Sequence, residues 1–461
     1  MNTTNQFNPI QTLNTLIDEV AQNIDRFSIP VGKATEKMFS RSRKLPIKTL
    51  LTLMFKMEGN SISKEIENNF PFTETMSASA FVQQRAKIKP EAFQYMLHRT
   101  NELIPRKKTF KGYDVVAIDG TDFYYPANPR SKCLIKHTKK SKNGEDIKDF
   151  CLLHANIIYD VLNKRYIDCI TGPKAGIGGN ERLFAEQFID KHIREKQIVI
   201  MDRGYMSYNL IEHGNRSGGY YILRSTISKA CSIPEIANLP DEEYDGWFDI
   251  KITPYQKKKY LNNGYRTLGI VKKGYKPSNE LSKFQIIERN KRWDFEEAVT
   301  IRFRAIKVRI NDDGKDQWEV LITNLPSDKF TVQDLKMLYG KRWGIETSFR
   351  SLKYAVGAIQ FHSKRDDFVL QEVYAKLVLF NITAAAGNEV EVPKKLNRKL
   401  DYAIDFKMSV ALVRKCFREK IESAKLLFKE MLKHTQPIRP GRKDERKMRP
   451  KTPIYFVYRV A

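Results

Sequence analysis

Three acidic residues stand where a folded chain could bring them together. Asp119 follows the apolar, β-branched run VVAI, and Asp202 follows the similar run IVIM. Glu346 lies in residues 338–353, whose apolar side chains recur at helical spacing. A helix packed beside the ends of two strands would add its carboxylate to theirs. Three converging carboxylates can hold two Mg²⁺ ions about 3.5–4 Å apart, the arrangement that catalyses in-line displacement at a phosphodiester.

The helix predicted over residues 338–353 also carries a stripe of polar side chains. Tyr339, Arg342, Glu346 and Lys353 follow one another at intervals of three, four and seven residues. On a helix these intervals place the four side chains within an arc of about 60°. A solvated face is the alternative interpretation, because a basic and an acidic residue at i, i+4 commonly form only a weak ion pair.

The composition favours a polyanionic partner. The chain has 81 Lys and Arg against 54 Asp and Glu, a formal charge of +27, and this surplus is typical of nucleic-acid binding. No apolar run approaches ~18 residues and the N-terminus has no secretory pattern, so we expect no membrane partner. The scattered cysteines predict reduced thiols in a cytosolic protein and no zinc site: Cys133, Cys151, Cys169, Cys231 and Cys416.

The elements that must position these residues form five successive regions. Residues 1–105 have helical spacing and predict a helical, DNA-binding region, because basic residues cluster ahead of two helices: Arg41, Arg43, Lys44 and Lys48, then Arg85, Lys87 and Lys89. Residues 106–225 contain three strands and then alternating helix and strand, which is typical of a mixed α/β sheet. Residues 226–328 predict a mostly β insertion. Residues 329–360 hold the polar stripe, and residues 361–461 predict helices that end in a flexible basic tail.

These motifs resemble those of the DDE transposases of the insertion-sequence-4 family. The family signature Y-x(2)-R-x(3)-E-x(6)-K is matched at every position, by Tyr339, Arg342, Glu346 and Lys353. The segments AIDGTD and MDRGY resemble the first and second aspartate segments of the family, which gives those positions to Asp119 and Asp202. The resemblance spans about residues 105–360. It implies a ribonuclease H-like catalytic domain, a mixed sheet flanked by helices and interrupted by a β-rich insertion.

The resemblance implies catalytic roles for the matched residues. Asp119, Asp202 and Glu346 would bind two Mg²⁺ ions, for which Mn²⁺ could substitute. Asp122, in the same loop as Asp119, is a competitor for the first position. By the same resemblance Arg342 and Lys353 would bind phosphate oxygens beside the scissile bond, and Tyr339 would donate its hydroxyl to a phosphate. A salt bridge to Glu346 is the alternative for Arg342.

Two further residues and one lysine-rich segment are predicted to contact DNA. By resemblance, Arg224 in the LRS segment contacts DNA near the cut, and a surface arginine is the alternative. The same resemblance implies that Trp318 stacks on a base flipped out of the duplex during hairpin formation, whereas most strand tryptophans pack against the sheet. The lysine-rich segment 130–148 would follow the DNA backbone, or be a solvated loop.

Together these features predict a bacterial DNA transposase, cytoplasmic and associated with the nucleoid. It would cut double-stranded DNA at terminal inverted repeats and join the ends to target DNA. The resemblance alone implies a homodimer and a hairpin step. Two alternatives stay open: a ribonuclease H-like nuclease without strand transfer, and a DNA-binding repressor derived from a transposase, against which the intact carboxylates argue.

Overall fold

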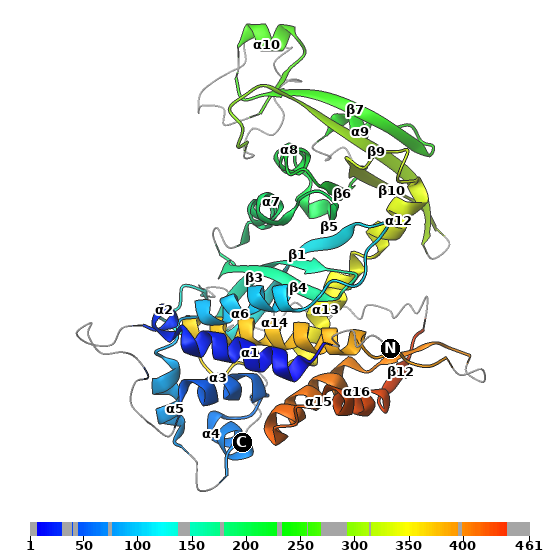
Figure 1. Ribbon diagram of the computed structural model, residues 1–461. Coiled ribbons are helices and arrows are strands. Elements are labelled where there is room, and N and C mark those ends of the chain that lie inside the picture. The colour runs from blue at the N-terminus through cyan, green and yellow to red at the C-terminus, as the bar shows by residue number, and fades with distance from the viewer. Residues whose placement is uncertain are drawn as a thin grey trace.

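The computed structural model describes residues 7–29, 39, 45–71, 76–136, 148–175, 179–227, 233–255, 257–268, 293–312, 315–394 and 399–439. Within them, a ten-stranded sheet carries helices on both faces, and a group of helices from both ends of the chain packs at its lower end (Figure 1). The predicted mixed α/β architecture is confirmed. Residues 137–147 of the lysine-rich segment, most of the basic tail and Cys231 lie outside the described residues, whose four cysteines are buried free thiols.

Five strands form the part of the sheet that the sequence predicted most directly. β1 (Asp114–Pro126) is antiparallel to β3 (Phe150–Asp160), which is antiparallel to β4 (Arg165–Pro173). β5 (Gln197–Met201) and β6 (Tyr220–Ser225) run parallel to β1. The resulting order β4-β3-β1-β5-β6 is consistent with the ribonuclease H-like fold that the resemblance implies. The short β2 (Leu134–Ile135) also pairs with β3.

The strands of the predicted insertion continue this sheet. β10 (Lys315–Thr323) pairs antiparallel with β6 and is followed in the sheet by β9 (Val299–Asp312), β7 (Tyr244–Thr253) and β8 (Arg266–Thr267). The short helices α9 (Pro234–Ala237) and α10 (Lys258–Asn262) lie along the same stretch of chain. Because β10 covers the edge of β6, no unpaired β6 edge is exposed.

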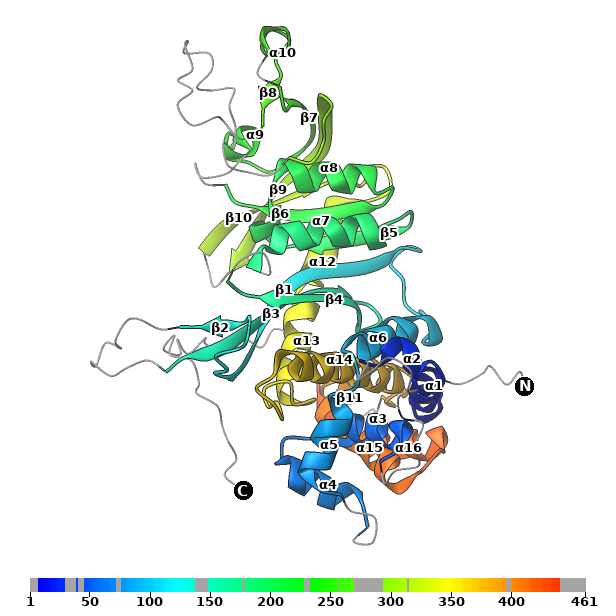
Figure 2. The ribbon, with the colours of Figure 1, turned by 90° about the vertical axis from the view of Figure 1, so that its left-hand side faces the viewer.

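Helices cover the two faces of the sheet. α7 (Glu181–His192) and α8 (Tyr208–Arg216) lie side by side on one face, which is turned toward the viewer in Figure 2. α12 (Val332–Gly340) packs on the opposite face, and α13 (Trp343–Tyr354) continues from it toward the helical group. Successive side chains of β5 pack on opposite faces of the sheet. Val199 and Met201 face α7 and α8, whereas Ile198 and Ile200 face α12.

The helical group combines both ends of the chain around one core. Its members are α1 (Pro9–Gln22), α2 (Ile24–Phe27), α3 (Ile47–Lys56), α4 (Ile62–Asn69), α5 (Ala78–Arg85), α6 (Glu91–Leu103), α14 (Asp366–Asn388), α15 (Phe406–Glu419) and α16 (Ala424–Leu432), with the hairpin of β11 (Tyr402–Ile404) and β12 (Thr435–Pro437). By length and composition α14 could cross a membrane, but 94% of its most apolar window is buried inside the protein, as in a core helix. Arg85, one of the basic residues behind the DNA-binding prediction, is buried here, where it pairs with Glu372 of α14.

Asp168 of β4 ties the helical group to α7. Its carboxylate lies 2.7 Å from His98 of α6, and 2.9 and 2.8 Å from His192 and Lys191 at the end of α7. Burial acts to raise the pKa of Asp168, but these partners outweigh it and hold the pKa well below its ordinary value. This carboxylate therefore stabilises the fold at neutral pH, and the stabilisation is lost as the pH falls below about 4.

We expect Asp168→Asn to make the free energy of unfolding depend less steeply on pH in the acid range. Below about pH 4, Asp168 binds a proton in the unfolded chain but stays ionised in the folded protein. The free energy of unfolding of wild type should therefore fall by up to about 1.4 kcal/mol more per pH unit than that of the variant. Urea unfolding followed by circular dichroism between pH 5 and pH 2 measures this difference. Asp18→Asn, at an exposed pair with Lys48, is the control and should keep the wild-type slope. Equal slopes for wild type and Asp168→Asn would contradict the assignment.

Candidate active site

The register of β1 and β5 brings two predicted site residues to the same level. These parallel strands pair from Asp114 opposite Gln197 to Ala117 opposite Ile200. Continuing this register places Asp119 opposite Asp202, on neighbouring strands about 4.8 Å apart. Both aspartates lie just beyond the last paired residues, where the two backbones no longer bond to each other.

The position of Asp119 within its strand differs from the prediction. Asp119 does not follow a strand that ends at Ile118, because β1 continues to Pro126. The strand runs on because β3 pairs with it along this whole stretch, with Asp119 opposite Ile157. Asp202 does follow its strand, as predicted, and leads into a short 3₁₀ turn, η3 (Arg203–Tyr205).

The predicted single helix over residues 338–353 is wrong, because two helices occupy this stretch. α12 ends at Gly340 and α13 begins at Trp343. At the junction the amides of Lys341 and Arg342 bond to carbonyls only three residues earlier, at 3.0 and 2.9 Å, which is the tighter 3₁₀ pattern. The four signature residues therefore do not share one uninterrupted helical face.

The junction nevertheless directs its side chains at the carboxylates. The Tyr339 hydroxyl donates to Asp202 Oδ1 at 3.1 Å, and Arg342 Nη1 donates to Glu346 Oε1 at 2.7 Å. Arg342 is only 3% exposed, so its charge acts in a largely dry environment. The salt bridge considered as the alternative for Arg342 is thus present. The guanidinium also lowers the pKa of both Asp119 and Asp202.

The two aspartates differ in their ease of ionisation. Burial raises the pKa of Asp119 to about 6, against the opposing effects of the Gly120 amide and Arg342 and with a further increase from Glu346. Partial burial also acts to raise the pKa of Asp202. There the Arg203 amide, Arg342 and the Tyr339 hydroxyl outweigh it and lower the pKa below its ordinary value. A neighbouring cation would favour the carboxylate form of Asp119 most.

The donor chemistry of the three carboxylates fits a divalent cation. All the donors of Asp119, Asp202 and Glu346 are oxygens, as Mg²⁺ prefers, and the raised pKa of Asp119 marks a place where added positive charge is favourable. In the part of the chain that the structure describes, however, the carboxylate oxygens of Asp119, Asp202 and Glu346 do not all lie within 4.8 Å of one another. The Arg342 guanidinium supplies positive charge to Asp119, Asp202 and Glu346.

Arg224 joins this group together with a carboxylate that the sequence analysis missed. Arg224 follows the β6 residue that pairs with Met201, and its charge lowers the pKa of Asp202. Its Nε lies 3.3 Å from Oε1 of Glu319 on β10, a carboxyl group whose pKa is raised by burial. Alternation in the run QWEVLIT could have revealed Glu319, because it puts Glu319 and Leu321 on the face that α12 covers.

Lys353 lies beside β1, and Trp318 lies between two cationic side chains of β9. Lys353 Nζ lies 5.7 Å from the centre of the Phe123 ring, and burial lowers its pKa, with partial compensation from Asp122. Trp318 and Glu319 are successive residues of β10, so their side chains point to opposite faces of the sheet. The half-buried Trp318 ring lies 4.4 Å from Lys307 Nζ and 5.0 Å from Arg309 Cζ.

A second polar cluster, also missed by the sequence analysis, lies beside Gly120. His154 Nδ1 is 2.5 Å from Asp122, and His154 Nε2 is 3.4 Å from Glu181 at the start of α7. Lys174 contacts both carboxylates, at 3.6 and 3.5 Å. A Cβ at residue 120 would lie 2.7 Å from the buried His154 ring and 2.9 Å from Glu181, so glycine alone fits between β1 and this cluster. Asp122 is engaged here, which favours Asp119 as the partner of Asp202.

The profile of the transposase DDE domain family matches residues 110–382, more than half of the chain. Among solved structures, the chain is similar to piggyBac transposase in a cryo-EM structure of its synaptic complex with hairpin DNA. The TM-score is 0.48 and the sequence identity 10%, over 95% of this chain and 88% of that one. No curated protein sequence matches the chain.

Proposed function

The chain belongs to the transposase DDE domain family, and we propose that it is a DNA transposase whose catalytic residues are Asp119, Asp202 and Glu346. The observation that supports this proposal is Arg342, a buried arginine that pairs with Glu346 and lowers the pKa of Asp119 and Asp202, whose strands β1 and β5 are neighbours. The signature at Tyr339, Arg342, Glu346 and Lys353 supports placing the chain in the insertion-sequence-4 group.

The three carboxylates would hold the divalent cations that DDE transposases use, and we propose two Mg²⁺ ions with Mn²⁺ as a substitute. When bound, these ions would activate the attacking water or 3′-hydroxyl and stabilise the departing oxygen. Arg342, now paired with Glu346, is positioned to bind a phosphate oxygen once Glu346 serves as a ligand. Tyr339 and Arg224 border Asp202 and would contact the DNA backbone near the cut. Lys353 would contact it beside β1.

The proposed substrates are the two terminal inverted repeats of a bacterial insertion sequence and a target duplex. The protein would act as a homodimer in the cytoplasm, at the nucleoid, and the net charge of +27 suits a DNA partner. It would hydrolyse one strand at each end, cut the other strand by transesterification through a hairpin, and join the ends to target DNA. A nuclease without strand transfer and a DNA-binding repressor are the competing functions.

Incubation of the full-length protein with a duplex that carries the repeats flanking its gene tests this proposal. With Mg²⁺ we expect nicked, hairpin and joined products in that order, and none with EDTA. Cleavage without joined products would favour the nuclease. Binding without cleavage in either Mg²⁺ or Mn²⁺ would favour the repressor.

Trp318 distinguishes a hairpin-forming transposase from a simple nuclease. Flipping a base out of the duplex costs a few kcal/mol, and stacking on an aromatic ring returns about 1–3 kcal/mol. We therefore expect Trp318→Ala to slow hairpin formation by roughly 5- to 150-fold while first-strand nicking stays near normal. A time course on end-containing oligonucleotides separates the two products, and an abasic site near the cut should partly rescue the variant.

Trp247→Ala is the matched control for Trp318→Ala. Trp247 is an exposed strand tryptophan of β7 that also lies against a cation, with Arg302 Cζ 5.1 Å from its ring centre. Neither step should change in this variant. If Trp318→Ala instead slows nicking and hairpin formation equally, Trp318 serves to pack between Lys307 and Arg309.

A further inference from the structure

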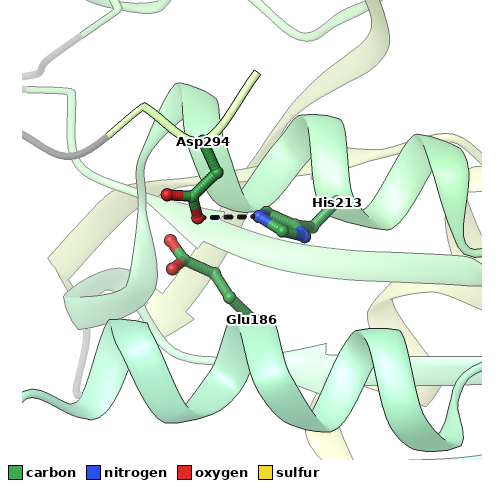
Figure 3. Close-up of side chains that lie close together, drawn as sticks. All are labelled: Glu186, His213 and Asp294. Carbon is green, nitrogen blue, oxygen red and sulfur yellow. Dashed lines mark hydrogen bonds and ion pairs between the residues drawn. The ribbon is translucent and has the colours of Figure 1, made fainter. Parts of the chain in front are cut away.

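Three potential metal ligands converge between α7, α8 and the chain that leads into β9. One donor atom from each of Glu186, His213 and Asp294 lies within 4.8 Å of the other two, and the three side chains point toward one another in Figure 3. Glu186 and His213 are buried, and Asp294 reaches them from the surface. We propose that these residues form a second divalent-metal site, which goes beyond the proposed function.

The surrounding contacts orient the donors as a ligand set requires. His213 Nδ1 lies 2.8 Å from Asp190, so its other ring nitrogen, Nε2, faces Asp294 at 3.2 Å. A carboxylate on the far nitrogen is the usual way in which proteins fix the ring of a metal-bound histidine. The Asn209 amide donates to Glu186 Oε1 at 2.8 Å and to Asp294 Oδ2 at 3.0 Å, so one side chain holds both carboxylates in place.

Charge and donor type indicate the class of cation. Glu186, Asp190 and Asp294 place three carboxylates around one imidazole, and a divalent cation would offset the repulsion among them. One imidazole nitrogen with two carboxylate oxygens is a donor set that suits Zn²⁺ or Mn²⁺, whereas Mg²⁺ favours oxygen donors alone. Zn²⁺ is the cation that we assign, with water completing its coordination.

This site lies on the face of the sheet opposite the proposed active site. α7 and α8 supply Glu186 and His213 and pack on one face, whereas α12 packs on the other. A bound cation would therefore have a structural role and would hold the chain that leads into β9 against α7 and α8. The neighbouring contacts serve the same end, because the Phe295 ring lies 4.9 Å from the His213 ring and Arg216 pairs with Glu297 at 2.6 Å.

Zinc uptake by the full-length protein tests the proposal. The protein carries Asp119→Asn and Glu346→Gln throughout, so that the proposed catalytic ligands do not contribute. After removal of metals with EDTA, addition of excess Zn²⁺ and exchange into metal-free buffer, we expect it to retain one equivalent of Zn²⁺ and to melt at a higher temperature than the metal-free protein. Co²⁺ should bind in its place, with visible absorption bands that report the coordination geometry of the bound ion.

Single substitutions assign the ligands. Adding His213→Gln or Glu186→Gln should weaken Zn²⁺ binding by more than the ~10–100-fold that losing an outer partner costs, and Asp190→Asn should weaken it by about that amount. His98→Gln, at a half-exposed histidine that also pairs with a carboxylate, is the control and should bind like its parent. If the buried-site variants do not fold, Asp294→Asn decides, because Asp294 is partly exposed.

Two results would overturn the proposal. The parent protein could take up no Zn²⁺ above the background of a buffer blank, or the ligand variants could bind it as tightly as the parent does. In either case His213 is an ion-paired histidine that joins α8 to Asp190 and Asp294. Loss of binding in Asp294→Asn together with retention in His98→Gln would support the site.

Discussion

Asp119→Asn, Asp202→Asn and Glu346→Gln are each expected to lower the rate of transposon-end cleavage by at least about 10³-fold, the equivalent of several kcal/mol of transition-state stabilisation. DNA affinity should change by only a few-fold. Each substitution keeps the size of the side chain and removes a proposed metal ligand, but none removes a phosphate-binding group such as Arg342 or Lys353.

Mg²⁺-dependent nicking of an end-containing duplex, together with gel-shift titration of the same DNA, separates the two effects. Asp122→Asn is the matched control, because Asp122 belongs to the cluster of His154 and Lys174 and should retain nicking within about tenfold of wild type. Normal nicking by one of the three variants would remove that residue from the active site. If Asp122→Asn abolishes nicking and Asp119→Asn does not, the two aspartates exchange their assignments.

Arg85→Ala is expected to lower the free energy of unfolding by about 3–5 kcal/mol. Arg85 is 1% exposed, and its Nη1 lies 3.0 Å from Oε1 of Glu372, which is 4% exposed. Its other nitrogens donate to Gln371 at 2.7 Å and to the Phe368 carbonyl at 2.6 Å. Removing the guanidinium leaves the buried carboxylate of Glu372 with less compensating charge and two buried acceptors without their donor.

Urea unfolding followed by circular dichroism measures this loss. Arg99→Ala is the control, because Arg99 is one-third exposed and pairs with Glu19 and Glu102 at the surface. Its loss should cost no more than about 1 kcal/mol. A comparably small loss in Arg85→Ala would show that His362 and Lys376, which also contact Glu372, compensate its charge without Arg85.

Local patterns in the sequence were sufficient to predict most elements of the core. The runs VVAI and IVIM are buried strands, and the apolar spacing of residues 181–193 matches α7. The features that were not predicted depend on partners distant in the chain. β1 continues past Asp119 because β3, about 30 residues later, pairs with it. The strands of the predicted insertion join the sheet because β10 pairs with β6, and alternation does not say which strand lies beside which.

The candidate site could be predicted by residue type but not by contact. Tyr339 bonds to Asp202, Arg342 bonds to Glu346, and Arg342 also lowers the pKa of Asp119 and Asp202. However, Asp119 lies inside β1 and the polar stripe is divided between α12 and α13. The break at Lys341 was missed because apolar spacing continues through it. Glu319 was missed because it comes from a strand whose place in the sheet depends on long-range pairing with β6.

The strand register that puts Asp119 opposite Asp202 determines which changes of chain length the protein can tolerate during evolution. The separation of the two carboxylates follows from backbone pairing between Asp114–Ala117 and Gln197–Ile200. Insertions or deletions in the turns between β1 and β5 leave that pairing untouched. Deleting one residue between Ala117 and Asp119, by contrast, would turn the carboxylate toward α7, because successive side chains of a strand point to opposite faces. Related chains should therefore vary freely in the length of these turns, while the short stretch from the last paired residues to the aspartates stays constant.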